Sequence, residues 1–176
     1  SVKAKPTSTP TPTYPAARAW HSFTANGGGD VATSRLYMYG GAGSDWQAVP
    51  NDLWYFRPYA DQWTLVTPSS TAKPGNRQHA GLSCGAGTCV TTAGSNGVGL
   101  VSETWVYSEA TNAWIKADCR RSPCPSLRQM VTLAFDPDRN QHLLFGGRGS
   151  TAGLNDTLTF DTATRKWTVR SPTLQP

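Results

Sequence analysis

The sequence predicts an all-β fold made of three repeats, each with four short strands. Glutamate, a good helix former, occurs only twice in 176 residues, while Thr, Val, Trp, Tyr and Gly are common, which favours short strands over helices. Strand-like patterns also recur three times between residues 15 and 172. The period is near fifty, because Trp63, Trp114 and Trp167 lie 51 and 53 residues apart.

The first strand of each repeat follows a turn that holds a proline and an arginine. The turns are Pro15–Arg18, Pro74–Arg77 and Pro125–Arg128. The strands expected after them are Trp20–Ala25, His79–Cys84 and Met130–Phe135. The second strand of each repeat runs into glycine, in Leu36–Gly41, Cys89–Gly94 and His142–Gly147. Apolar runs of this kind suit strands that are buried between sheets.

The third and fourth strands carry two columns of large side chains. A polar pair opens each third strand, in Asn51–Phe56, Ser102–Tyr107 and Asn155–Phe160, and the fourth strand holds the tryptophans named above. Trp54, Trp105 and Leu158 keep the same intervals as those tryptophans. Two columns with one period are hard to produce by chance. We expect both columns in the core, since tryptophan supplies a large apolar area between adjacent sheets.

These signatures resemble the kelch repeat, whose period is about 50 residues. The matching elements are the Gly-Gly after the second strand, the Asn-Asp before the third and the Trp of the fourth. The resemblance implies three four-stranded antiparallel blades of a β-propeller, at about 15–73, 74–124 and 125–172. The second repeat departs from the pattern, with Ala93-Gly94 in place of Gly-Gly and Ser102-Glu103 in place of Asn-Asp.

Outside the repeats we expect an extended strap or linker at 1–14, where prolines alternate with Thr and Ser, and a short tail at 173–176. Three blades form only a half-propeller, because closed propellers have four to eight blades. The sides of the first and last blades would then expose apolar surface that needs a partner. We expect this partner to be another copy of the chain or other propeller blades, from another protein or from a longer chain.

Kelch propellers commonly bind partners through loops that share one face, and the resemblance places Arg18, Arg77 and Arg128 around the channel mouth on that face. Three arginines there would bind the carboxylates or sulfates of an acidic protein or glycan through forked hydrogen bonds. The alternative is that they bond carbonyls of the neighbouring blade. Further candidates for ligand binding on this face are Trp46, Arg120, Arg121 and Arg148.

Four cysteines occur as two close pairs, Cys84 with Cys89 and Cys119 with Cys124. The even count and the turn-rich gaps favour two local disulfides, 84–89 and 119–124. A four-thiolate zinc site is the alternative, although four intervening residues lie at the long end of zinc-ligand spacing. Disulfides would indicate an extracellular or cell-surface setting.

Several classes of function find no support in the sequence. No apolar run is long enough to span a membrane, and the charge of +5 is scattered, so we expect neither membrane insertion nor nucleic-acid binding. The three histidines do not fall together in the repeat pattern, and we expect no metal and no cofactor. Phosphate-binding loops, dinucleotide fingerprints and nucleophile elbows are missing, and no catalytic residue is predicted.

The sequence therefore favours an extracellular kelch-like module that binds a protein or glycan through its loop face or its open blade sides. Two alternatives stay open. The chain is either a domain of a carbohydrate-active or oxidative enzyme whose catalytic residues lie elsewhere, or a purely structural subunit of an extracellular assembly. Fold alone does not decide between them.

Overall fold

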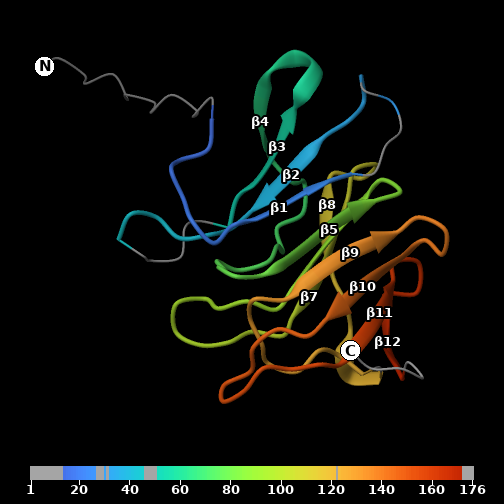
Figure 1. Ribbon diagram of the computed structural model, residues 1–176. Coiled ribbons are helices and arrows are strands. Elements are labelled where there is room, and N and C mark those ends of the chain that lie inside the picture. Colours follow the sequence, from blue (N-terminus) through green and yellow to red (C-terminus); the bar gives the residue numbers. More distant parts are fainter. Residues whose placement is uncertain (1–13, 27–29, 31, 46–50, 122, 172–176) are drawn as a thin grey trace, which may run out of the picture.

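The computed structural model describes residues 14–26, 30, 32–45, 51–121 and 123–171. These residues form three four-stranded antiparallel sheets, as predicted, and the second sheet lies between the first and the third (Figure 1). Trp46, the tail at 173–176 and the predicted strap, apart from Tyr14, lie outside the described residues.

Within each sheet the strands follow chain order, and every neighbouring pair is antiparallel. The first sheet contains β1 (Ser22–Ala25), β2 (Leu36–Tyr39), β3 (Leu53–Arg57) and β4 (Gln62–Val66). The second contains β5 (Gly81–Gly85), β6 (Thr88–Thr92), β7 (Thr104–Ser108) and β8 (Ala113–Lys116). The third contains β9 (Thr132–Asp136), β10 (Gln141–Phe145), β11 (Thr157–Asp161) and β12 (Lys166–Arg170). Two short 3₁₀ segments, η1 (Pro58–Ala60) and η2 (Cys119–Arg121), are the helical elements of the described chain.

The first strands begin two residues later than predicted, and the reason is a repeated backbone conformation. Trp20, His79 and Met130 have φ angles of +57°, +55° and +57°, which lie in the left-handed region that strands do not use. These three residues connect the sheets instead. The amide of His79 donates to the carbonyl of Trp20 at 2.9 Å, and the amide of Met130 donates to the carbonyl of His79 at 2.8 Å.

A second set of backbone hydrogen bonds joins the sheets at the glycine pairs. The amide of Gly41 donates to the carbonyl of Arg77 at 2.9 Å, and that of Gly94 donates to the carbonyl of Arg128 at 2.8 Å. Each pair of adjacent sheets is therefore linked by the same two bonds, which we call the backbone rungs. They hold β1, β5 and β9 close together along one edge of the stack (Figure 1).

The core consists of two clusters, one in each space between adjacent sheets. Trp105, Trp114 and Trp167 belong to these clusters, and Trp54 is buried outside them, so these four tryptophans are buried as the repeat pattern predicts. Trp63 is the exception, because it is only half-buried and faces away from the second sheet. The expectation that the whole tryptophan column lies in the core is therefore wrong for its first member.

The two disulfides form as predicted, between Cys84 and Cys89 and between Cys119 and Cys124. The first joins directly opposed residues of β5 and β6 and is buried in the core between the first two sheets. The second closes the loop that contains η2, between β8 and β9. All four cysteines are used, so the zinc alternative does not hold.

Candidate functional site

The three predicted ligand arginines are buried, and each bonds to groups of its own sheet. Arg18 pairs with both carboxylate oxygens of Asp52, at 2.6 and 2.9 Å, and also donates to the carbonyl of Gly40 at 3.1 Å. Arg128 repeats this arrangement with Asp156, at 2.5 and 2.6 Å, and with the carbonyl of Gly146 at 2.9 Å.

Arg77 follows the same plan with a longer acid. It bonds to Glu103 Oε2 at 3.4 Å and to the carbonyls of Ala93 and Glu103. Glu103 also accepts from Lys116 and from the indole of Trp105. Burial opposes ionisation of Glu103, but its hydrogen bonds from Lys116 and Trp105 outweigh that effect, so its pKa is lowered. The hydrogen bonds from Arg128 likewise lower the pKa of Asp156.

These contacts give the arginines a structural role: each guanidinium links the opening turn of its repeat to the glycine turn and to the start of the third strand. The carbonyls that they satisfy belong to their own sheet and not, as the alternative prediction had it, to the neighbouring one. Binding of an acidic ligand by Arg18, Arg77 and Arg128 stays a prediction that these contacts do not favour, since the forks are already occupied.

The remaining predicted ligand residues of the described chain lie on two different loops, and their joint role in ligand binding stays a prediction. Arg120 is exposed and pairs with Asp118, whose pKa these hydrogen bonds lower to about 2. Arg121 lies in η2 and Arg148 is exposed beside the Gln129 bridge. Within the described residues, no group of three or more His, Cys, Asp and Glu side chains is placed to bind a metal ion.

The largest repeated feature is the contact between neighbouring sheets, which uses equivalent residues each time. We call the side of a sheet that faces the following sheet its trailing face, and the other side its leading face. Between the first two sheets, Tyr39 packs against Trp114 at 5.7 Å and Tyr37 against Tyr107 at 6.4 Å, measured between ring centroids. In the same interface the hydroxyl of Ser22 donates to the carbonyl of Ala80 at 2.5 Å.

The contact between the second and third sheets adds polar pairs to the same scheme. The indole of Trp167 donates to the hydroxyl of Thr104 at 3.0 Å, and His142 Nδ1 bonds to the hydroxyl of Ser83 at 3.0 Å. Gly81 and Gly85 make room for β9, because a Cβ atom at either would lie within 3.0 Å of Val131 or Phe135. The second sheet is therefore covered on both faces.

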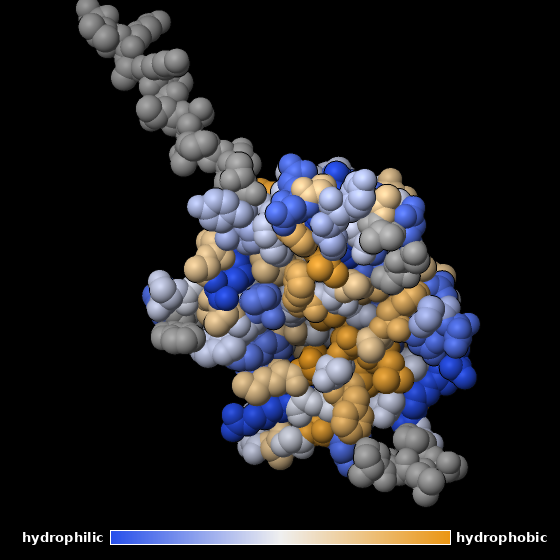
Figure 2. Space-filling view, turned by 45° about the horizontal axis from the view of Figure 1, so that its top comes forward, coloured by the Kyte–Doolittle hydropathy of each residue, from blue (hydrophilic) through white to orange (hydrophobic). Residues whose placement is uncertain are grey.

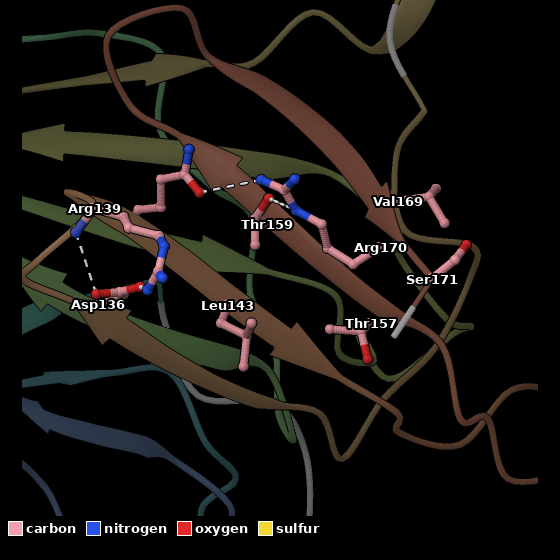
Figure 3. A pocket seen from close by; sticks show the side chains of 9 residues that line it. Asp136, Arg139, Leu143, Thr157, Thr159, Val169, Arg170 and Ser171 are labelled. Carbon is pink, nitrogen blue, oxygen red and sulfur yellow. Dashed lines mark hydrogen bonds and ion pairs between the residues drawn. The ribbon is translucent and has the colours of Figure 1, made fainter. Parts of the chain in front are cut away.

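The trailing face of the third sheet lacks such a cover. Leu143 and Phe145 are 40% and 39% exposed, although Tyr37 and Tyr39, at the equivalent positions of the first sheet, are each 1% exposed. A groove of about 680 Å³ runs over this face, lined by Leu143, Thr157 and Thr159 together with charged side chains of Asp136, Arg139 and Arg170 (Figure 3).

The leading face of the first sheet is uncovered in the same way. Its Phe23 is 49% exposed, and Phe56 and Trp63 are half-buried, although their equivalents Tyr107 and Trp114 are buried in the second sheet. The rings of Phe23 and Phe56 lie beside that of Trp63, with centroids 6.1 and 5.2 Å from its own. Figure 2 shows hydrophobic side chains that gather across one face of the molecule, with hydrophilic ones around them.

The comparison with protein-family models decides the family. The model that describes the KLHDC2/KLHL20/DRC7 kelch-repeats domain matches residues 3–176. The chain belongs to the kelch-repeat family. A search of curated proteins finds no match. The three sheets are thus kelch blades, and the fold is the predicted half-propeller.

The sequence predicted binding through the loop face or the open blade sides, but it named candidate residues only on the loop face. Leu143, Phe145, Thr132 and Thr157 had no part in the predicted site. These residues could have been found by aligning the three repeats, because the alignment shows which residues have equivalents at covered interfaces.

The described part of the chain holds no helix with the length and apolar character that a bilayer crossing requires.

Proposed function

We propose that this kelch module is an extracellular protein-binding and assembly module, and that it binds through its two open sides. These sides are the trailing face of the third blade, centred on Leu143 and Phe145, and the leading face of the first blade, centred on Phe23 and Trp63. Kelch repeats generally serve protein interactions, so the class of function follows from the family.

The observation that carries the proposal is the contrast between equivalent residues. Side chains that are 0–1% exposed in the covered interfaces, such as Tyr39 and Thr92, correspond to Phe145, which is 39% exposed on the third blade. Contiguous apolar surface of this kind marks an interaction site on a folded protein. A protein partner fits better than a small ligand, because the two sides are broad sheet faces and not enclosed cavities.

The extracellular setting rests on the two disulfides. Disulfides persist in oxidising compartments and are rare in the reducing cytosol. Binding of an acidic glycan has less support. Each of the three arginines expected to bind acidic groups already forms an ion pair inside the protein, with Asp52, Glu103 or Asp156. The main reason to expect acidic ligands at the loop face was these three charges, and they are already paired.

The test is hydroxyl-radical footprinting of the protein in the assembly recovered from the medium of cells that secrete it. We expect Phe23, Leu143 and Phe145 to be labelled weakly, because a partner covers them. Val98, between β6 and β7 of the middle blade, and Tyr59, in η1, are 96% and 80% exposed; they serve as controls and are labelled strongly. Labelling of the open sides at the level of these controls would contradict the proposal.

A further inference from the structure

We propose that the partner on both open sides is a second copy of this chain, bound head to tail so that two half-propellers close one six-bladed ring. This inference rests on the proposed function, since it names the occupant of the same two faces. The interface between the third blade of one copy and the first blade of the other would repeat the chemistry of the two interfaces inside each chain.

The backbone rungs show the first match. In each internal interface the following blade offers the carbonyl of its arginine to a glycine amide and the amide two residues later to a carbonyl of the preceding blade. On the third blade the equivalent groups are the amide of Gly147 and the carbonyl of Met130. On the first blade of the second copy they are the carbonyl of Arg18 and the amide of Trp20. The rungs can therefore continue with the same kinds of main-chain groups, and the Arg18 carbonyl also accepts a hydrogen bond from the side chain of His21.

Two hydroxyl groups give the second match. Thr157 occupies the position of Thr104, which accepts the indole N–H of Trp167, and Trp63 occupies the position of Trp167. Thr132 occupies the position of Ser22, whose hydroxyl donates to the carbonyl of Ala80, and His21 occupies the position of Ala80. A second copy thus supplies an indole donor for Thr157 and a carbonyl acceptor for Thr132.

The apolar side chains give the third match. Phe145 stands where Tyr39 packs against Trp114, so it meets Trp63 of the second copy. Leu143 stands where Tyr37 packs against Tyr107, so it meets Phe56. The charged residues Arg139, Arg170 and Asp136 surround this apolar centre, as expected for an interface with a polar rim (Figure 3).

Two-fold symmetry makes the arrangement close. Each copy places its third blade against the first blade of the other, so both open sides of both copies are covered at once. The resulting six blades lie within the range of four to eight that closed propellers use.

The experiment is a complementation test read by light scattering of the purified chain. The wild-type protein is expected at twice 18.9 kDa. Leu143→Asp and Phe56→Lys each bury an unpaired charge in both interfaces and should raise the dissociation constant about 100-fold or more. Mixing the two variants should restore the double mass, because the mixed dimer has one wild-type interface and one Asp–Lys pair.

Ile115→Asp is the matched control, since Ile115 lies on β8 of the middle blade with 44% exposure, close to that of Leu143. It should leave the double mass unchanged, and circular dichroism should show strand content in every variant. Two results would overturn the inference. One is a wild-type protein that is folded but monomeric at 100 times the protein concentration used for footprinting, and the other is a mixture of the two variants that does not regain the double mass. If the open sides are still protected in the secreted assembly while its mass reveals a different chain, the proposed function holds and this inference fails.

Discussion

His142 lies in β10, where the sequence predicts it at the start of a second strand. The structure buries it completely between the second and third blades. Its Nδ1 atom bonds to Ser83, its ring packs against Phe135 at 5.1 Å, and its Nε2 atom is buried without a partner. Burial lowers the pKa of His142 to about 4, because the charged imidazolium would lose its hydration.

We predict that acid weakens the contact between these blades through His142. The unfolded chain binds a proton near pH 6.5, whereas the folded protein does so only near pH 4, so folded-state stability falls as the pH drops from about 6.5 to about 4. The loss approaches about 3 kcal/mol at the low end of this window. Urea unfolding of wild type and His142→Leu across this range measures it. Equal pH dependence in the two proteins would contradict the assignment.

The arginines show how far single residues can be predicted. Their recurrence in three turns was visible in the sequence, and so was their chemical capacity for forked hydrogen bonds. Their partners could not be seen in the sequence. Each arginine pairs with an acid 26 to 34 residues away, which reaches it only when the third strand returns to the opening turn; these acids are Asp52, Glu103 and Asp156. The same residue type therefore suggested a ligand site where the fold makes an internal brace.

At the scale of elements, the glycine turns set the spacing between blades. Gly40 has φ +67°, and a Cβ atom there would lie 2.2 Å from the carbonyl oxygen of Arg77 in the next blade. Ala93 occupies the equivalent position in the second repeat with φ +62°, so it adopts a backbone that side chains disfavour. The departure of the second repeat from Gly-Gly was noticed in the sequence, and the structure shows that the turn is kept despite it.

Exchanging glycine and alanine at these two equivalent positions should change the stability of the protein in opposite directions. Gly40→Ala should destabilise the protein by about 2 kcal/mol or more, because the clash forces the blades apart. Ala93→Gly should stabilise it by about 0.5 kcal/mol, since relief of left-handed strain slightly exceeds the added chain entropy. Gly75→Ala, which meets open space, is the control. Chemical denaturation measures the free energies of unfolding. A Gly40→Ala variant as stable as the wild type would show that the turn tolerates a Cβ atom.

The strands themselves were predicted well, because their alternating and apolar patterns are local. The starts were less accurate: the first strands begin at Ser22, Gly81 and Thr132, two residues later than expected. The left-handed residues two positions before these starts are Trp20, His79 and Met130, and of these residue types only His is enriched in that conformation. Their geometry is imposed by hydrogen bonds to the next blade, and a single-repeat pattern does not contain that information.

For the whole molecule, the number of repeats predicted the open sides before the structure located them. Counting three periods was enough, because the ring cannot close. The composition of each side was beyond prediction, since it depends on which strand faces each blade presents. Trp63 illustrates this point: it shares its column with Trp114 and Trp167, but it lies on the leading face of the first blade, which no blade of the described chain covers.

This difference should be measurable in dilute protein, where association is absent. Trp167→Ala should lower the free energy of unfolding by about 3–5 kcal/mol, as truncation of a buried aromatic does. Trp63→Ala should cost only about 1–2 kcal/mol, because this side chain is only partly buried in the folded chain. Equal losses for the two variants, measured by urea titration, would mean that the first blade has a cover that the described residues do not include.

The backbone rungs also bear on how such a protein grows. Their donors and acceptors are main-chain groups, so side-chain chemistry is restricted only at the glycine that donates, where a Cβ atom would clash. Tandem duplication of one fifty-residue unit would lengthen the arc by a blade and keep the new junction in register from its first generation. Later substitutions would then need to adapt only the side chains on the blade faces. Gain and loss of repeats could in this way convert partial propellers into closed ones and back.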